Sequence, residues 1–359
     1  MSDPDDRLRR ARLSAQGLAR PRAATPEEVV RGLLAVQAQD LRGSRLAIRA
    51  RSTGLTSADV DDALTVRRSL VVGWLNRGTL HLVAAEDYWW LHALTASRSE
   101  VANARRLRQE GVSEAQAARG VDVVVEAVRA RGPLTRAQLK DHLDDAGVPT
   151  ERQALVHVLF AASIDGCLVR GPIVDGEQAF VDPTSWIGAP ELLDASQSSA
   201  RLARRYLAGH GPAGERDLAK WAGLSLGAAR AAFAEVGDEV APWGDGLSQL
   251  ASPSSAAPLP PPRLLGPFDP ILHGWASRAV FVGDHHGIVT SNGIFRSTAL
   301  VEGKTTATWT LDDRGVILRP LEAMSATTMD ALEQDARAVQ RYLGRPEKGI
   351  VAVEHSHRY

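Results

Sequence analysis

Two segments of this chain repeat the same order of features, and the repeat limits the folds open to it. Residues 132–145 and 211–225 both begin near a Gly-Pro pair and continue as a short amphipathic helix that ends in a turn. Each is followed by a second segment with apolar residues at helical spacing, at 150–160 and 225–233. Two short helices joined by a tight turn are typical of a helix-turn-helix. The repeat therefore predicts several small modules of one kind.

Strand-like runs complete these modules. Residues 167–181 hold two such runs around turn-forming Gly-Pro and Asp-Gly pairs, which predicts a hairpin. Helix-turn-helix followed by a hairpin is the order of a winged helix. A third copy fits near the N-terminus, where we expect helices at 55–64 and 69–75 and the start of a wing at 78–83.

The chain changes character at 251–262, a proline-rich stretch without an apolar period that we expect to be a stiff linker. Beyond it, strand-like runs separated by Gly, Asp and Asn predict a small antiparallel sheet or barrel. The expected strands are 279–282, 287–290, 297–301 and 305–311. A helix at 328–343 and a short strand at 350–353 are expected to close the chain.

The predicted fold class is α+β: three tandem winged-helix units followed by a small β-domain. Five parts are expected along the chain. They are a first winged helix at 1–95, a connecting helix with the second winged helix at 96–190, the third winged helix at 191–250, the linker at 251–262 and the β-rich domain at 263–359.

Composition narrows the class of protein. The 359 residues are 44% hydrophobic and 24% charged, as in a soluble globular protein of several small domains. The N-terminus lacks the apolar core of a signal peptide, and no run of about 18 apolar residues could span a bilayer. We therefore expect a cytoplasmic protein with no membrane partner. Cys167 is the only cysteine, which excludes an intrachain disulfide and a thiolate metal cluster.

The charge pattern leaves the question of nucleic-acid binding open. The net charge of −1 argues against nonspecific coating of nucleic acid. However, 38 of the 42 basic residues are arginines, whose planar fork grips phosphate. Clusters at 7–12, 105–108 and 201–205 could form a basic face, although exposed helix faces carry such clusters anyway.

Gln37 and Gln39 follow a clear helix start. Residues 25–28, Thr-Pro-Glu-Glu, form a capping box with proline at the first helical position, so a helix is predicted from residue 26. Its apolar stripe directs Gln37 toward the protein, and Gln39 would point about 200° away in a continued helix. Both can face one ligand only if the helix ends near Gln37 and the chain extends. The alternative interpretation is a polar turn that bonds backbone carbonyls.

Four segments together carry a family resemblance. The Gln37-Ala-Gln39 motif lies about 35 residues before 74–83, Trp-Leu-Asn-Arg-Gly-Thr-Leu-His-Leu-Val. Residues 264–270, Leu-Leu-Gly-Pro-Phe-Asp-Pro, and 291–296, Ser-Asn-Gly-Ile-Phe-Arg, continue the pattern. The chain resembles the bacterial winged-helix DNA glycosylases of the AlkZ type, the azinomycin-resistance glycosylase family, whose catalytic motif is Gln-x-Gln or Gln-x-Asp.

The resemblance implies a DNA repair enzyme that hydrolyses the N-glycosidic bond of N7-alkylated purines and unhooks interstrand crosslinks, a self-resistance activity. It also implies a concave, C-shaped arrangement of the winged helices around DNA, with Gln37 and Gln39 as the catalytic pair. An N7-alkyl purine is cationic and leaves without a general acid, so fixed amide dipoles need only position a water and stabilise the oxocarbenium-like sugar. No lysine near the motif could form a Schiff base, so a monofunctional glycosylase is expected.

Other candidate residues concern DNA and metals. Arg77, beside the wing strand, and His355 and His357 are candidate DNA contacts. These histidines and the His285-His286 pair invite a metal interpretation, but the chain has no HExxH and only one cysteine, so no metal site is expected. Without a Walker or dinucleotide motif, no cofactor is expected either.

The expected partner is double-stranded DNA with alkylated or crosslinked purines, bound by a monomer associated with the nucleoid. Two alternatives stay open. One is a noncatalytic winged-helix DNA-binding protein or transcriptional regulator, although such regulators usually bind as symmetric dimers with one reading helix per subunit. The other is a relative that removes simple monoadducts but not crosslinks.

Overall fold

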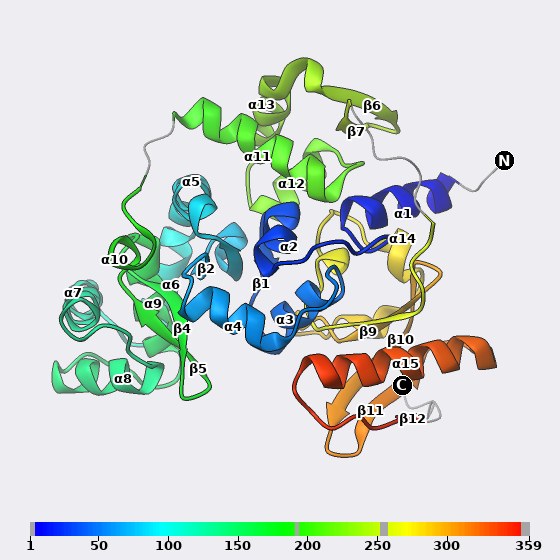
Figure 1. The fold of residues 1–359 in the computed structure, drawn as a ribbon. Coiled ribbons are helices and arrows are strands. Elements are labelled where there is room, and N and C mark those ends of the chain that lie inside the picture. The colour runs from blue at the N-terminus through cyan, green and yellow to red at the C-terminus, as the bar shows by residue number, and fades with distance from the viewer. Residues whose placement is uncertain (1–3, 191–193, 252–257, 353–359) are drawn as a thin grey trace. The chain divides into compact units, whose positions relative to one another are not determined.

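The computed structural model describes residues 4–190, 194–251 and 258–352 (Figure 1). Its contacts divide the chain into two units. The terminal unit comprises residues 1–60 and 200–359, and the central unit comprises residues 61–199. The segments around Gln37 and around residue 264 thus belong to one unit, although the central unit separates them in the sequence. The five-part division expected from the sequence is finer and stays a prediction.

The terminal unit begins with α1 (Pro4–Ala15), α2 (Pro26–Leu33), the short strand β1 (Val36–Gln37) and α3 (Leu41–Arg49). The predicted helix start at residue 26 is confirmed, because Thr25 caps α2 by accepting a hydrogen bond from the Glu28 N–H at 3.2 Å. Two helices cross the division between the units, α4 (Ser57–Thr65) and α11 (Ala195–His210).

The helix pair predicted from the repeat is present, and a hairpin follows it. They are α12 (Glu215–Ala222), α13 (Leu226–Val236), β6 (Val240–Gly244) and β7 (Leu247–Leu250). Gly223 ends α12 with a φ of +73°, and Ser225 caps α13 through the Ala228 N–H. The Gly-x-Ser-x-Gly pattern around Ser225 is therefore the turn between two helices.

A five-stranded sheet closes the terminal unit. Its strands are β8 (Arg263–Leu265), β9 (Thr298–Val301), β10 (Lys304–Asp312), β11 (Gly315–Pro320) and β12 (Ile350–Ala352), in the order β12-β11-β10-β9-β8. Helix α15 (Ala326–Tyr342) packs on this sheet (Figure 1). Leu332 and Val339 of the helix share one core with Trp309 and Leu318 of the sheet.

The sequence predictions for this region were partly wrong. The expected strand at 279–282 is the short helix α14 (Ala279–Val282), and 287–290 overlaps a 3₁₀ turn at His286–Ile288. Short apolar runs do not distinguish a strand from a buried helical turn. The sheet is not purely antiparallel, because β12 pairs with β11 in parallel. The chain between them contains α15, which supplies the long crossover that parallel strands require.

The central unit combines a mixed set of helices with an antiparallel sheet. Its strands are β2 (Leu70–Trp74), β3 (Leu80–Ala84), β4 (Val169–Val174) and β5 (Glu177–Val181), and its order is β3-β2-β4-β5. Its helices are α5 (Ala85–Thr95), α6 (Glu100–Gln109), α7 (Glu114–Arg131), α8 (Arg136–Asp145), α9 (Ala154–Ile164) and α10 (Pro183–Ile187). Within the described ranges, no helix combines the length and apolarity that a bilayer span requires.

The predicted helix-turn-helix and hairpin at 132–181 correspond to α8, α9, β4 and β5. In contrast, the expected helix at 69–75 is strand β2, which was a wrong prediction. All five residues of β2 are buried. A strand that is covered on both faces shows a continuous apolar run without alternation, and such a run resembles a buried helix.

One buried histidine in the terminal unit lies within an aromatic cluster. His210 is fully buried, stacks on Tyr206 at 4.7 Å between ring centroids, and packs against Trp221 and Trp275. Neither ring nitrogen has a hydrogen-bond partner of good geometry in the described part of the chain. Burial, followed by the nearby charge of His273, lowers the pKa of His210 to about 3, although the Tyr206 carbonyl partly opposes this shift.

We expect the terminal unit to lose stability as the pH falls from about 6.5 toward about 3, because the unfolded chain takes up a proton on His210 that the folded chain does not accept. The contribution reaches at most about 1.4 kcal/mol per pH unit. His210→Phe keeps the ring packing and removes the titrating group. Urea unfolding at pH 7 and pH 4.5 should show a smaller loss of stability in the variant. An equal loss in both proteins would contradict the assignment.

Candidate active site

The glutamine pair lies on an extended segment between two helices. Helix α2 ends at Leu33, and Leu34 has a φ of +67° and a ψ of −46°, an uncommon conformation for a residue other than glycine. The chain then extends through Gln37 before α3 begins. The predicted extension is present, but the helix ends earlier than expected, so Gln37 is not on a helix face. Backbone strain of this kind concentrates near functional sites.

The two amide side chains are joined to each other. The Gln37 Nε2 donates a hydrogen bond to the Gln39 Oε1. Gln37 is only 5% exposed, whereas Gln39 is exposed. The Gln37 Oε1 is buried and has no donor among the described residues. The alternative interpretation of a polar turn requires a side-chain amide that donates to a backbone carbonyl. Neither amide does so within the described ranges. The pair forms a short chain of amide dipoles that leads from the interior to the surface.

Asp40, directly after the pair, caps α3. Its Oδ1 accepts a hydrogen bond from the Gly43 N–H at 2.5 Å, and its side chain is half-buried. An N-cap carboxylate satisfies one of the open N–H groups of the helix start. The geometry therefore gives Asp40 a structural task beside the site.

Helix α3 rests against the segment 264–270 at backbone distance. A methyl group on Gly43 would lie 2.5 Å from the Pro267 carbonyl oxygen, and one on Gly266 would lie 2.8 Å from the Leu46 Cβ. Both positions therefore exclude a side chain unless the backbone moves. The segment that resembles the family motif thus serves as a support for the helix that follows Gln39.

A buried ion pair fixes this contact. The two Nη atoms of Arg51 donate to the two carboxylate oxygens of Asp269 at 2.8 and 2.9 Å, and the side chains are 2% and 0% exposed. A bidentate pair fixes orientation as well as distance. Sequence reasoning missed this pair because no local spacing rule connects residues on either side of the central unit.

The helix that precedes the pair is anchored by α11. The Arg205 side chain donates to the Arg31 carbonyl at 2.8 Å, close to the C-terminal end of α2. A methyl group on Gly209 would lie 2.4 Å from the Gly32 carbonyl oxygen, so α11 also approaches α2 at backbone distance. The extended segment with the glutamines is therefore held from both sides within the terminal unit.

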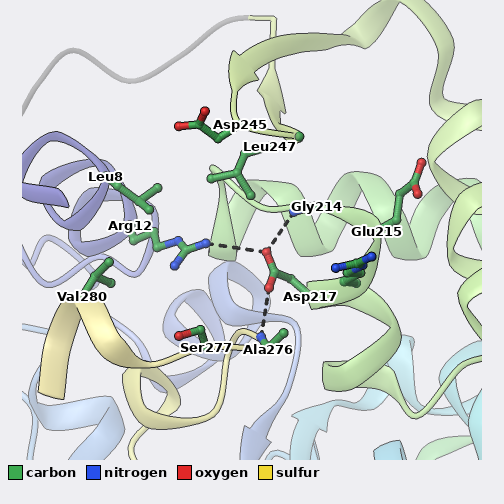
Figure 2. A pocket seen from close by; sticks show the side chains of 12 residues that line it. Leu8, Arg12, Gly214, Glu215, Asp217, Asp245, Leu247, Ala276, Ser277 and Val280 are labelled. Atoms are coloured by element: carbon green, nitrogen blue, oxygen red, sulfur yellow. Dashed lines mark hydrogen bonds and ion pairs between the residues drawn. The ribbon is translucent and has the colours of Figure 1, made fainter. Parts of the chain in front are cut away.

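Figure 2 shows a pocket of about 450 Å³ lined by α1, the start of α12, the β6–β7 turn and the chain just before α14. Asp217 faces it, accepts hydrogen bonds from the Gly214 and Ala276 N–H groups, each at 2.9 Å, and forms an ion pair with Arg12 at 3.6 Å. A carboxylate satisfied in this way links three segments of the unit. Neither glutamine lines this pocket, so the pocket is distinct from the glutamine pair. The candidate active site is the glutamine pair, because the family motif lies there.

Of the three predicted DNA contacts, only Arg77 lies within the described residues. Arg77 lies in the turn between β2 and β3 with a φ of +58°, is half-buried and also interacts within the chain. His355 and His357 lie outside the described residues. Among the residues that the structure describes, no group of three or more His, Cys, Asp or Glu side chains could hold a metal ion.

Several arginines of the three expected basic clusters are engaged in intramolecular contacts. The three clusters lie on α1, α6 and α11. Within the described ranges the contacts are Arg7 with Trp243, Arg9 and Arg10 with Asp6, Arg12 with Asp217, Arg106 with Glu110, Arg108 with Glu114, and Arg204 with Glu239. The exposed pairs contribute only about 0–1 kcal/mol each, so a phosphate could replace a carboxylate there.

The comparisons with known proteins agree with this architecture. The sequence matches the family described as DNA glycosylase AlkZ-like over residues 30–342. Among solved structures, the DNA glycosylase AlkZ of Streptomyces sahachiroi matches with a TM-score of 0.81 and 23% sequence identity. The match covers 98% of this chain and 100% of that chain, and it establishes the fold. No match was found among curated proteins.

The family match defines the class of protein: an enzyme that acts on DNA in repair. The chain belongs to the AlkZ-like DNA glycosylase family. The resemblance inferred from the sequence is thereby confirmed, and the partner of the protein is DNA. The family match spans the glutamine segment, α3 and the segment 264–270 that supports it.

Substitutions at Asp40 can distinguish a role as the N-cap of α3 from a role as a general base. Asparagine is as good an N-cap as aspartate but cannot accept a proton, so Asp40→Asn should keep both the stability and most of the excision rate. Asp40→Ala should lower the free energy of unfolding by about 1 kcal/mol. Urea unfolding and single-turnover excision would measure both. A loss of roughly 10²-fold or more in Asp40→Asn would instead identify a general base.

Proposed function

We propose that the protein is a monofunctional DNA glycosylase that hydrolyses the N-glycosidic bond of N7-alkylated purines and unhooks interstrand crosslinks, with Gln37 and Gln39 as its catalytic pair. The observation that carries the proposal is the joined amide pair on a segment anchored from both sides. Membership of the family supports the reaction class. The azinomycin-type lesion remains the expected substrate.

The chemistry suits neutral amides. Alkylation at N7 makes the purine a cationic leaving group, so its departure requires no general acid. The reaction then needs a positioned water and stabilisation of positive charge on the sugar. Amide carbonyl dipoles that are fixed before the reaction meet both needs without reorganisation. A full proton transfer to an amide is not required, because the attacking water becomes strongly acidic as it bonds to the oxocarbenium-like carbon and releases its proton to the surrounding water.

The two glutamines take different roles in this proposal. Gln39, which is exposed, faces the sugar and the attacking water with its carbonyl. Gln37, which is buried, donates to that carbonyl oxygen and fixes its direction. The buried Gln37 Oε1 is an acceptor without a donor in the described ranges, a situation that costs about 1–3 kcal/mol. A donor from the substrate or from the attacking water would remove that cost when the complex forms.

The helix–hairpin modules would hold the duplex. We propose that the modules at 136–181 and 215–250, with a third formed by the N-terminal segments, are winged helices that bind the duplex. A crosslinked nucleotide cannot swing fully out of the duplex, because it is tied to the opposite strand. An exposed catalytic side chain such as Gln39 therefore suits this substrate better than a deep base-flipping pocket.

The proposed reaction leaves an intact strand with an abasic site. A duplex that carries one N7-alkyl guanine should yield strand breaks only after alkali, since the sequence places no lysine next to the pair that could form a Schiff base. A gel of products with and without alkali, run in parallel with a defined interstrand crosslink, tests the proposal. Strand breaks without alkali would exclude a monofunctional enzyme. Excision of the monoadduct alone would limit the activity to simple lesions.

The pair itself is tested by substitution. Gln37→Ala and Gln39→Ala should each slow excision of N7-alkyl guanine by roughly 10²-fold or more, the loss seen when one preorganised polar group is removed. Duplex binding should change little, because the phosphate contacts lie elsewhere. Gln39→Asp should keep much of the activity on monoadducts, since a carboxylate at this position can also orient water.

Gln334→Ala provides the matched control, because Gln334 is exposed on α15. Its single-turnover rate should equal that of the wild type. A wild-type rate in the Gln37→Ala, Gln39→Ala double variant, with an unchanged circular dichroism spectrum, would return both residues to a structural role.

A further inference from the structure

Arg170, which is half-buried, differs from the buried arginines that were discussed above. Arg51 binds Asp269, and Arg12 binds Asp217 and the Pro212 carbonyl. The Arg170 guanidinium makes no hydrogen bond and no ion pair within the described ranges, and its Nε is buried without a partner. A charged group that is partly removed from water and has no partner costs free energy, so its retention requires an explanation.

Two aromatic rings hold this guanidinium in place. Its central carbon lies 5.0 Å from the ring centroid of Trp74 and 5.0 Å from that of Phe180. Trp74 in turn stacks on Phe160 of α9 at 5.4 Å. These contacts restrict the guanidinium and favour its charged form. They occupy the π-faces of the rings and leave the N–H groups of Arg170 unused.

The polar groups near Arg170 are hydrogen-bond donors rather than acceptors. Arg170 pairs with Phe180 across β4 and β5, and Gln178, two residues before Phe180, lies on the same face of the sheet with its Nε2 buried and unpartnered. Leu134 exchanges backbone hydrogen bonds with Phe180, which brings Arg136, the exposed first residue of α8, to this side. Burial, followed by the charge of Arg136, lowers the pKa of Arg170 to about 10, and no carboxylate offsets either effect.

We propose that Arg170, together with Arg136 and Gln178, binds a phosphodiester group of the DNA backbone. The two Nη atoms of Arg170 are absent from the buried unpartnered atoms and have no protein partner in the described ranges, so they remain accessible to an anion. A planar guanidinium that is fixed by two rings suits bidentate binding of phosphate oxygens. The site lies between the helix pair and the hairpin of the 136–181 module, and it rests on the proposed use of this module to hold the duplex.

The test measures binding of undamaged duplex by fluorescence anisotropy over a range of salt concentrations, so that it does not depend on excision. Arg170→Met keeps the apolar packing between the rings and removes the charge. It should weaken binding roughly tenfold, as expected for the loss of a charged hydrogen bond, and should reduce the slope of log K against log salt concentration by about 1. Arg136→Gln, at an exposed position, should reduce the slope as well.

Arg337→Gln is the matched control. It removes the same charge from an exposed residue of α15 that is paired with Glu333, and it should leave affinity and slope unchanged. Thermal unfolding supplies a second measurement: Arg170→Met should be as stable as the wild type or more stable, because an unpaired buried charge is replaced by an apolar group of similar length.

Three results would overturn the proposal. The first is a destabilised Arg170→Met variant with an unchanged salt slope, which would make Arg170 a packing residue. The second is an equal loss of slope in Arg337→Gln, which would show a nonspecific effect of net charge. The third is thermal stabilisation of the wild type, but not of Arg170→Met, by inorganic phosphate at matched ionic strength without any difference in duplex binding. That result would assign the site to a free anion. Failure of the wild type to excise, together with the expected loss of slope in Arg170→Met, would instead count against the proposed reaction alone.

Discussion

The buried pair of Arg51 and Asp269 is the interaction on which the geometry of the terminal unit depends. Arg51 also donates to the Ala47 carbonyl and to both oxygens of Gln16, and the Gln16 amide donates to the Gly209 carbonyl. One guanidinium thereby joins α1, α3, α11 and the segment 264–270. Breaking such a pair by removing one partner costs about 3–5 kcal/mol, because the other charge stays buried and unpaired. The network therefore specifies one arrangement of the segments that surround the glutamines.

A rigid frame matters more for an amide than for a carboxylate. A neutral amide stabilises positive charge only through its dipole, and the direction of that dipole decides the energy. The extended segment at Gln37 is only a few residues long and lies between two helices whose adjoining ends touch other backbone. Gly43, Gly209 and Gly266 permit these contacts because a side chain at any of them would collide with a neighbour. The stiffness that the proposed chemistry needs thus comes from glycines and a buried ion pair outside the motif.

The sequence correctly predicted those structural features that depend on residues close together in the chain. The N-cap at Thr25, the helix pairs at 136–164 and 215–236 and the hairpin after the first pair follow from turn residues and apolar spacing within short windows. Errors occurred where local patterns are ambiguous, as in the apolar runs that became β2 and α14. The extended backbone at Gln37 was anticipated, but the Gln37–Gln39 hydrogen bond and the support by residues 264–270 depend on segments distant in sequence. Only a folded chain or a family resemblance brings such segments together.

The distribution of arginines bears on how the protein can bind DNA with almost no net charge. An arginine that is paired with a carboxylate must leave it to reach a phosphate, and the carboxylate then repels the DNA, so the exchange gains little. Arg204 on α11 illustrates this case, since its guanidinium is bound by Glu239. Arg170 has no carboxylate to leave, and its side chain is already ordered between Trp74 and Phe180. A contact of that kind gains the full phosphate interaction without the entropy of ordering a flexible side chain. A nearly neutral protein can therefore hold a duplex through a small number of preorganised guanidinium groups, and under the proposal made for Arg170 such groups, rather than the clusters of arginine in the sequence, would position the backbone of the DNA.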